Sequence, residues 1–122
     1  MKDHLALELA RGTYAAGEQV SGTVRVLEAA KGRELTLALE YRDWTSDYRA
    51  VNRSVALPGP LHVGDLEDGA SFPFSVRLPE DALPEQYGRF GAASWGVHAQ
   101  LERSGPDFHA WHQFELGQRV IP

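Results

Sequence analysis

The most constraining feature of this sequence is an alternation of apolar and polar residues with a period of two. It is clearest in residues 34–44, ELTLALEYRDW, and it recurs in residues 70–78, ASFPFSVRL. The side chains of an extended strand point to opposite faces in turn, so each run predicts a strand with one buried face. Pro73 stands inside the second run. Because proline donates no hydrogen bond to a sheet ladder, we expect this strand at an edge or a bulge.

Four further runs alternate in the same way, and turn-forming glycine and proline residues separate them. They are Leu5/Leu7/Leu9, Val20/Gly22/Val24/Val26, Val51/Arg53/Val55/Leu57 and Trp95/Val97/Ala99/Leu101. No long segment has a helical period, and residues 79–92 leave room for one helical turn at most. The sequence therefore predicts one domain over residues 1–122, an all-β, antiparallel, immunoglobulin-like sandwich of two sheets with about seven to eight strands.

Charge and the absence of cysteine exclude several classes of function. Twelve Lys and Arg residues stand against 17 Asp and Glu, and the formal net charge of -5 repels a phosphate backbone, so we expect no nucleic-acid binding. Without cysteine, the chain forms no disulfide, thiolate nucleophile or cysteine-ligated metal site. No apolar run has the length of a secretory signal or of a membrane span. We therefore expect a cytoplasmic protein that does not insert into membranes.

Residues 89–117 hold three of the five histidines and two of the three tryptophans, a density that suggests a metal or catalytic site. An antiparallel hairpin that turns in the middle of this stretch separates them instead. In that register the apolar residues of both arms share one face, and His98 lies opposite Trp111 and diagonal to His109 on the other face. His112 falls on the apolar face, where we expect it to be partly buried. The three imidazoles therefore do not converge on one point.

What remains is a pair of surface histidines, His98 and His109, with Asp107 or Glu102 near the turn. A catalytic zinc needs three protein ligands in a fixed geometry with a supporting second shell, so we expect no metal site and no cofactor. The alternative that stays open is a metal-binding or metal-sensing protein that uses these two histidines. No nucleophile turn and no phosphate-binding loop with a following helix occurs, so we expect the chain not to be an enzyme.

Residues 14–26, YAAGEQVSGTVRV, resemble the Y-x-x-G-[ED]-x-[VL]-x-G-x-V-x-[VL] opening of arrestin-fold N-terminal domains. This family includes arrestins, their α-arrestin relatives, the retromer subunit of the Vps26 kind and bacterial sporulation-control proteins. Further segments resemble later parts of the family pattern in the right order, and together they cover most of the chain. They are residues 35–45, LTLALEYRDWT, residues 72–102, FPFSVRLPEDALPEQYGRFGAASWGVHAQLE, and residues 107–116, DFHAWHQFEL.

The physical interpretation of individual motif residues agrees with this resemblance. We expect Gly17 in a turn that needs an unusual φ, and Gly22 at a strand kink or at the close approach of another strand. Trp95 is expected to be a large apolar plug between the sheets. One departure is that Glu85 and Gln86 replace the small polar residue that the family usually has after the second proline.

The resemblance implies a non-enzymatic protein-binding, scaffold or adaptor domain with an unknown protein partner. Arrestins and the retromer subunit carry two sandwiches in tandem and only one is expected here, so we also expect a homodimer through a strand edge or a sheet face. The candidate contact surface comprises His98, His109, Trp111, Trp44 and Tyr48. The position of Trp44 at the end of its strand is equally compatible with closing the core. A secreted structural or carbohydrate-binding sandwich is a third alternative, which the missing signal and cysteines disfavour.

Overall fold

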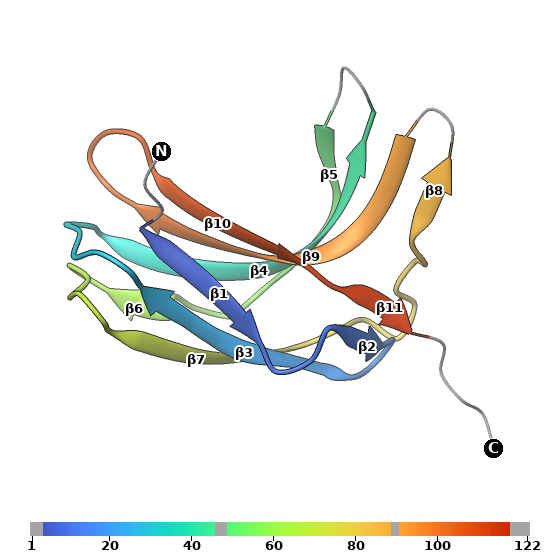
Figure 1. Cartoon of the computed structure of the whole chain (residues 1–122), viewed down its shortest axis with the longest axis horizontal. Coiled ribbons are helices and arrows are strands. Elements are labelled where there is room, and N and C mark those ends of the chain that lie inside the picture. Colours follow the sequence, from blue (N-terminus) through green and yellow to red (C-terminus); the bar gives the residue numbers. More distant parts are fainter. Residues whose placement is uncertain (1–3, 46–48, 89–90, 118–122) are drawn as a thin grey trace.

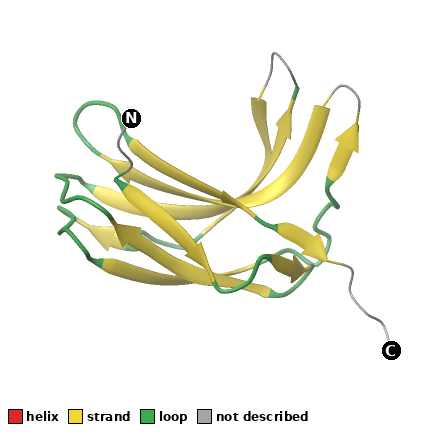
Figure 2. Ribbon diagram, in the orientation of Figure 1, coloured by secondary structure: helices red, strands yellow, loops and turns green. Residues whose placement is uncertain are grey.

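The computed structural model describes residues 4–45, 49–88 and 91–117, which form eleven strands and no helix (Figures 1 and 2). In chain order the strands are β1 (Leu5–Leu9), β2 (Thr13–Ala15), β3 (Gln19–Val26), β4 (Glu34–Trp44), β5 (Arg49–Ala56), β6 (His62–Val63), β7 (Ser71–Arg77), β8 (Gln86–Gly88), β9 (Gly91–Glu102), β10 (Phe108–Gln113) and β11 (Glu115–Gly117). Over these described ranges, no helix is available to cross a membrane.

The strands form two main layers (Figure 1). A small sheet has the order β1-β3-β7, and a larger sheet has the order β10-β9-β4-β5, with β6 pairing with β4 and β8 with β9. Both sheets are antiparallel, so the predicted all-β sandwich is confirmed. A separate parallel pair, β2 with β11, was not predicted. Four of the eleven strands have only two or three residues, and the seven longer ones agree with the predicted number.

The core lies between the two sheets, on the face that the alternation predicted. Buried apolar side chains of β4 stand beside buried apolar side chains of β9, so each contributes to a continuous layer. The register pairs Leu35 with Leu101, Leu37 with Ala99, Leu39 with Val97 and Tyr41 with Trp95. Burial of one large apolar side chain contributes roughly 1.5–3 kcal/mol to stability. This central pair of strands is therefore the best-supported part of the fold.

Two core aromatic residues also fix the chain between β7 and β8. The indole Nε1 of Trp95 donates a hydrogen bond to the carbonyl oxygen of Leu83 at 2.9 Å. The hydroxyl of Tyr41 donates to the carbonyl oxygen of Pro84 at 2.7 Å. Burial raises the pKa of Tyr41, which keeps its hydroxyl protonated as a donor. Trp95 is fully buried, as predicted for a plug, and it is also a tether for this segment.

The turn between β2 and β3 explains the glycine of the first sequence motif. Gly17 has a φ of 84°, in the left-handed region that side chains disfavour, as predicted. Its N–H donates to the carbonyl oxygen of Leu78 at 3.0 Å. The carboxylate of Glu18 accepts the N–H of Ala15 at 2.9 Å. The turn thereby ties the start of β3 to the residue that follows β7.

The two neighbours of β3 in the small sheet, β7 and β1, account for the predictions made for Pro73 and Gly22. Over the described residues, β7 pairs with β3 alone. The even-numbered residues of β7 direct their backbone N–H and C=O groups toward β3, as the bonded pairs of Val26 with Ala70 and of Glu18 with Leu78 show on either side of the strand. The backbone nitrogen of Pro73, an odd-numbered residue, therefore faces the open edge of the sheet. On the other side of β3, a Cβ on Gly22 would lie 2.1 Å from the carbonyl oxygen of Glu8. Close approach of β1, rather than a kink, therefore requires this glycine.

The predicted alternation of β5 is wrong at Val51. Tyr41 pairs with Arg53, whereas Arg42 pairs with Val51, so a bulge at Asn52 interrupts the register. One extra residue in a strand reverses the face of the residues beyond it. Val51 therefore lies on the outer face of the large sheet, where it is 51% exposed, instead of joining Arg53 on the inner side.

Candidate functional site

The outer face of the large sheet, turned away from the small sheet, carries the residues of interest. One end of β4, β5, β8 and β9 rises away from the small sheet, which makes this outer face concave (Figure 1). The hairpin of β9 and β10 has the predicted register, with His98 paired to Trp111 and Gln100 to His109. His98 and His109 are therefore diagonal neighbours on this face, as expected.

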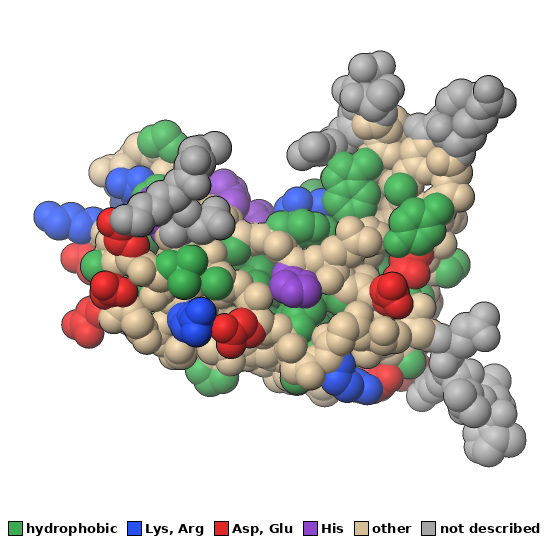
Figure 3. Space-filling model, viewed as in Figure 1, with side chains coloured by type: hydrophobic (Ala, Val, Ile, Leu, Met, Phe, Trp, Pro, Cys, Tyr) green, Lys and Arg blue, Asp and Glu red, His purple; other side chains and the backbone are tan. Residues whose placement is uncertain are grey.

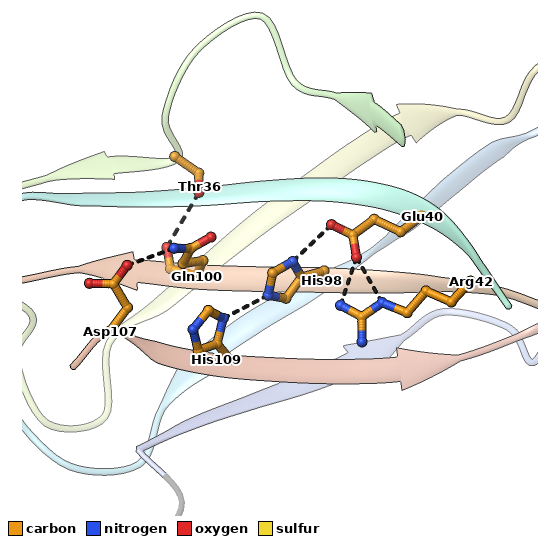
Figure 4. Close-up of polar contacts among 7 residues, drawn as sticks. All are labelled: Thr36, Glu40, Arg42, His98, Gln100, Asp107 and His109. Atoms are coloured by element: carbon orange, nitrogen blue, oxygen red, sulfur yellow. Dashed lines mark hydrogen bonds and ion pairs between the residues drawn. The ribbon is translucent and has the colours of Figure 1, made fainter. Parts of the chain in front are cut away.

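Three side chains from three strands form a hydrogen-bonded chain across this face, which we call the histidine relay: Glu40, His98 and His109 (Figure 4). Nδ1 of His98 lies 2.9 Å from Oε2 of Glu40, and Nε2 of His98 lies 2.8 Å from Nδ1 of His109. The imidazole planes are 9° apart and the ring centroids 5.1 Å apart. Because the facing nitrogens are so much closer than the centroids, the rings lie edge to edge in nearly one plane, as a linear hydrogen bond requires.

Glu40 is the centre of this network and is only 8% exposed. Its Oε1 accepts hydrogen bonds from Nε and Nη2 of Arg42 at 2.8 and 2.6 Å (Figure 4). A carboxylate removed from water needs such partners, because an unpaired buried charge is strongly unfavourable. The alternation of β4 places Glu40 on the outer face but carries no sign of these partners, since they lie partly on other strands. Sequence reasoning therefore missed both Glu40 and Arg42 as site residues.

Arg42 links the relay to two tryptophans, and we call Arg42, Trp44 and Trp111 the aromatic cluster. The guanidinium carbon of Arg42 lies 3.8 Å from the ring centroid of Trp111. The rings of Trp44 and Trp111 meet edge to face, with centroids 6.0 Å apart. A Cβ on Gly96 would lie 2.3 Å from the ring of Trp111, so this indole covers the backbone of β9. Trp44 is thus half-buried on the outer face and does not close the core.

Beyond the His109 end of the relay, the carboxylate of Asp107 accepts hydrogen bonds that stabilise the turn between β9 and β10. Its Oδ2 accepts a hydrogen bond from Nε2 of Gln100 at 2.7 Å, and its Oδ1 accepts the N–H of Arg103 at 3.2 Å (Figure 4). These two bonds, the side-chain bond foremost, hold the pKa of Asp107 below its ordinary value. The hydroxyl of Thr36 reaches the carbonyl oxygen of Gln100 at 3.5 Å.

The contacts of the relay bear on the metal-binding alternative. Within residues 4–45, 49–88 and 91–117, no group of three or more His, Asp or Glu side chains is placed to hold a metal ion. A zinc ion about 2.0–2.1 Å from two imidazole nitrogens holds them roughly 3.3–3.4 Å apart and directs both lone pairs at one point. The nitrogens of His98 and His109 instead face each other at 2.8 Å. This geometry suits a shared proton better than a shared metal.

Two other residues named in the sequence analysis, Tyr48 and His112, are considered next. Tyr48 lies outside the described residues, so its place in the contact surface stays a prediction. His112 pairs with Val97 as expected, but it is exposed rather than partly buried, because β10 is the edge strand of the large sheet. Nδ1 of His112 lies 2.9 Å from the carbonyl oxygen of Gln113.

Tyr87 extends the aromatic surface along β8, and sequence reasoning missed it because three residues show no period. Tyr87 and Trp44 both pair with Ala92 of β9, one from each side, so the three side chains project from one face. Tyr87 is 67% exposed. Residues 43–45, 86–88 and 91–93 line a hollow of about 420 Å³ in this raised part of the sheet, where Figure 3 shows hydrophobic side chains at the surface.

Comparisons with known proteins bear on the fold. No protein-family model matches the chain, and no curated protein matches it in sequence. The crystal structure of Spo0M, a sporulation control protein from Bacillus subtilis, matches with a TM-score of 0.66 and 23% sequence identity. The fold is arrestin-like. The match covers 94% of this chain and 49% of the Spo0M chain, so this chain spans about half the length of that structure.

Proposed function

We propose that this chain is an arrestin-like adaptor domain that contacts protein partners through the concave outer face of its large sheet. The observation that carries the proposal is the group of apolar side chains on that face, Trp44, Trp111, Tyr87 and Val51. Exposed aromatic residues are the preferred anchors of protein contacts, and a contiguous apolar patch marks an interaction site. The structural likeness to Spo0M supports a regulatory or adaptor type of domain.

The proposal assigns no catalytic step, metal or cofactor to the chain. In our interpretation the histidine relay is a positioning device, because Glu40 holds Arg42, and Arg42 in turn stacks on Trp111. The cysteine-free composition fits a protein that works in the cytoplasm. His109 and Tyr48 stay in the proposed contact surface on the sequence argument alone.

The test is site-specific photo-crosslinking in the native cell. A benzophenone amino acid replaces Tyr87 on the outer face of the large sheet in one variant. In the control it replaces Leu27, an exposed apolar residue (41%) that follows β3 in the small sheet. We expect discrete protein adducts from position 87 and none from position 27. Adducts from position 27 alone, or from neither position, would reject the outer face as the contact surface.

The same experiment tests the homodimer expected from the sequence. A self-adduct with twice the mass of the chain, formed at position 87, would identify a second copy as the partner. An edge-to-edge dimer has less support, because the edge of β7 carries Pro73 and the edge of β5 carries a bulge next to Arg53. Both features are known ways of protecting strand edges from pairing.

A further inference from the structure

The guanidinium of Arg42 has one edge bonded within the chain and one edge without a partner. Nε and Nη2, on the first edge, both donate to Oε1 of Glu40, at 2.8 and 2.6 Å. The second edge, formed by Nη1 and Nη2, presents two parallel N–H groups. These groups have no acceptor among the described residues, and Figure 4 shows Nη1 turned away from Glu40. The side chain is 24% exposed, so a ligand can reach this edge from solvent.

Arg42 is also held in one position before any ligand binds. Besides its two bonds to Glu40, its guanidinium carbon lies 3.8 Å from the ring centroid of Trp111, which in turn contacts Trp44 edge to face. His98 holds Glu40 from the other side, with Nδ1 2.9 Å from Oε2. A long side chain that binds a ligand usually loses rotamer freedom at that moment, whereas this one is already ordered. The free edge is therefore preorganised.

The other charges at the raised end of the large sheet favour an anionic ligand. Both carboxylates in this part of the sheet already accept hydrogen bonds, Glu40 from Arg42, and Asp43 from Nδ2 of Asn52 at 2.9 Å. Arg49, which pairs with Trp44 in the register, is a second arginine at this end. Over residues 40–45, 49–51, 86–88 and 91–96, the charged residues are Glu40, Arg42, Asp43 and Arg49. A cationic ligand would thus meet arginines and no unpaired carboxylate of these described ranges.

The opposite end of the outer face is acidic, but it is too far away to cancel this attraction. Glu34 and Glu102 are exposed there and stand opposite each other in the register of β4 and β9. Glu34 lies eight positions before Arg42 on β4, which is roughly 27 Å along a strand. The Debye length at physiological ionic strength is about 8 Å, so charges at the two ends are screened from each other. An acidic segment is therefore drawn to the raised end.

A carboxylate matches the free edge better than a phosphate group does. Both anions can accept the two parallel N–H groups of a guanidinium. Oε1 of Glu40 lies beside the same guanidinium, and it repels a phosphate group, which carries nearly two charges, more strongly than a carboxylate with one. The side chains around Arg42 on this face include Trp44, Trp111 and Val51, which favour apolar neighbours for the bound carboxylate.

We propose that the free edge of Arg42 binds the side-chain carboxylate of an acidic residue that is flanked by apolar residues in a segment of a partner protein. The inference rests on the proposed function, since it names the chemical group through which a partner engages the outer face. Arg42 makes the charged contact, and the two neighbouring tryptophans, Trp44 and Trp111, contact the apolar flanks.

The test is a titration of the whole chain with two capped five-residue peptides. One has a central glutamate between leucine and phenylalanine residues, and the other has glutamine in its place. The shift of the indole N–H of Trp111 in NMR spectra measures binding in every variant. We expect the wild type to bind the glutamate peptide about tenfold more tightly than the glutamine peptide, and Arg42→Gln to bind both equally. Arg25→Gln, which removes an exposed arginine of the small sheet, is the control and should behave as the wild type.

A second variant covers the case in which Arg42→Gln fails to fold. Arg42→Lys keeps a positive charge beside Glu40 but lacks the two parallel donors. It should retain the melting temperature of a folded chain, and its preference for the glutamate peptide should fall to about threefold or less. A full tenfold preference in this variant would show that the guanidinium edge is not the binding group.

Equal affinity of the wild type for both peptides, or a preference that survives in Arg42→Gln, would overturn the inference. Tighter binding of a peptide with a central phosphoserine would also overturn it and would identify phosphate as the ligand. If neither peptide binds but photo-crosslinks form at position 87, the carboxylate contact is wrong and the outer face remains the contact surface. If the crosslinks fail too, the proposed function is wrong as well.

Discussion

Glu40 is the residue on which the order of the outer face depends most. Its two oxygens serve Arg42 and His98, two side chains that are themselves only partly exposed. An ionised carboxylate only accepts hydrogen bonds, so a neutral His98 carries its proton on Nδ1 and accepts on Nε2. With His98 in this form, His109 donates from Nδ1, and its own Nε2 lone pair is directed away from the relay. In this arrangement the carboxylate selects the tautomers of both neutral imidazoles.

Glu40→Ala should lower the free energy of unfolding by about 2–3 kcal/mol, because it leaves the guanidinium of Arg42 without its charged acceptor in a partly buried place. Urea unfolding at pH 7.5 measures the change. Glu34→Ala, an exposed glutamate on the same strand, is the control and should change stability by less than about 0.5 kcal/mol. Nitrogen-detected NMR of the wild type should show the Nδ1–H tautomer at both His98 and His109. Equal stability losses in the two variants would contradict the assigned role of Glu40.

Asp107 makes acid stability a second residue-level test. Its pKa is lower in the folded chain than in the unfolded one, so its contribution is fully present above the unfolded value, about 3.9, and is lost as the pH falls through the lower folded value. Asp107→Asn should therefore lower the melting temperature at pH 7, and the difference from the wild type should shrink steadily below about pH 4. Asp68→Asn, which removes an exposed carboxylate from another turn, is the control. A difference that stays constant from pH 7 to pH 2 would exclude this linkage.

At this scale the sequence predicts which face a side chain occupies better than which partners it finds. The parity of residues in the β9–β10 hairpin placed His98 and His109 correctly, because a tight turn sets the register of its two strands. The bonds of Glu40 depend on the pairing of β4 with β9, two strands with four other strands between them in the chain. No local pattern sets that register, so the relay could not be predicted from the sequence.

Among the elements, β7 offers a clear test of edge protection. Pro73 removes an N–H from the open side of this strand, where a second chain could otherwise pair. Pro73→Thr restores that N–H and should make the chain self-associate in a concentration-dependent way without loss of stability. Sedimentation velocity over a hundredfold concentration range detects this. Ser71→Thr, at another exposed position of the same edge, adds strand propensity but no new donor and should stay like the wild type. If Pro73→Thr sediments like the control, proline is not the block.

The long strands were predictable from the sequence and the short ones were not, for a physical reason. A period of two needs at least four or five residues to be recognised, so β4, β7 and β9 were predicted while β2, β8 and β11 were missed. The parallel pairing of β2 with β11 joins segments from the two ends of the described chain, which no turn connects. The bulge in β5 leaves a sequence that still alternates, and only the structure shows that Val51 has changed face.

For the whole molecule, the arrangement of the two sheets divides the large sheet into two unequal parts. One end of β4 and β9 lies over the small sheet and holds the fully buried pairs, such as Leu39 with Val97. The other end rises beyond the small sheet (Figure 1) and carries Trp44 and Tyr87 on its outer face. The family resemblance predicted the sandwich but not this division, because it depends on how strongly the long strands bend. The stable core and the proposed contact surface thus lie at different ends of the same two strands.

Hydrogen exchange should show this division directly. Amides protected by burial and by strands on both sides exchange only through global unfolding, whereas those in weakly packed segments exchange through local opening. We expect the slowest exchange in residues 35–39 and 97–101, and exchange faster by at least a hundredfold in β5, β8 and residues 91–93. Uniform protection along β4 and β9 would show instead that the raised end is as firmly held as the core.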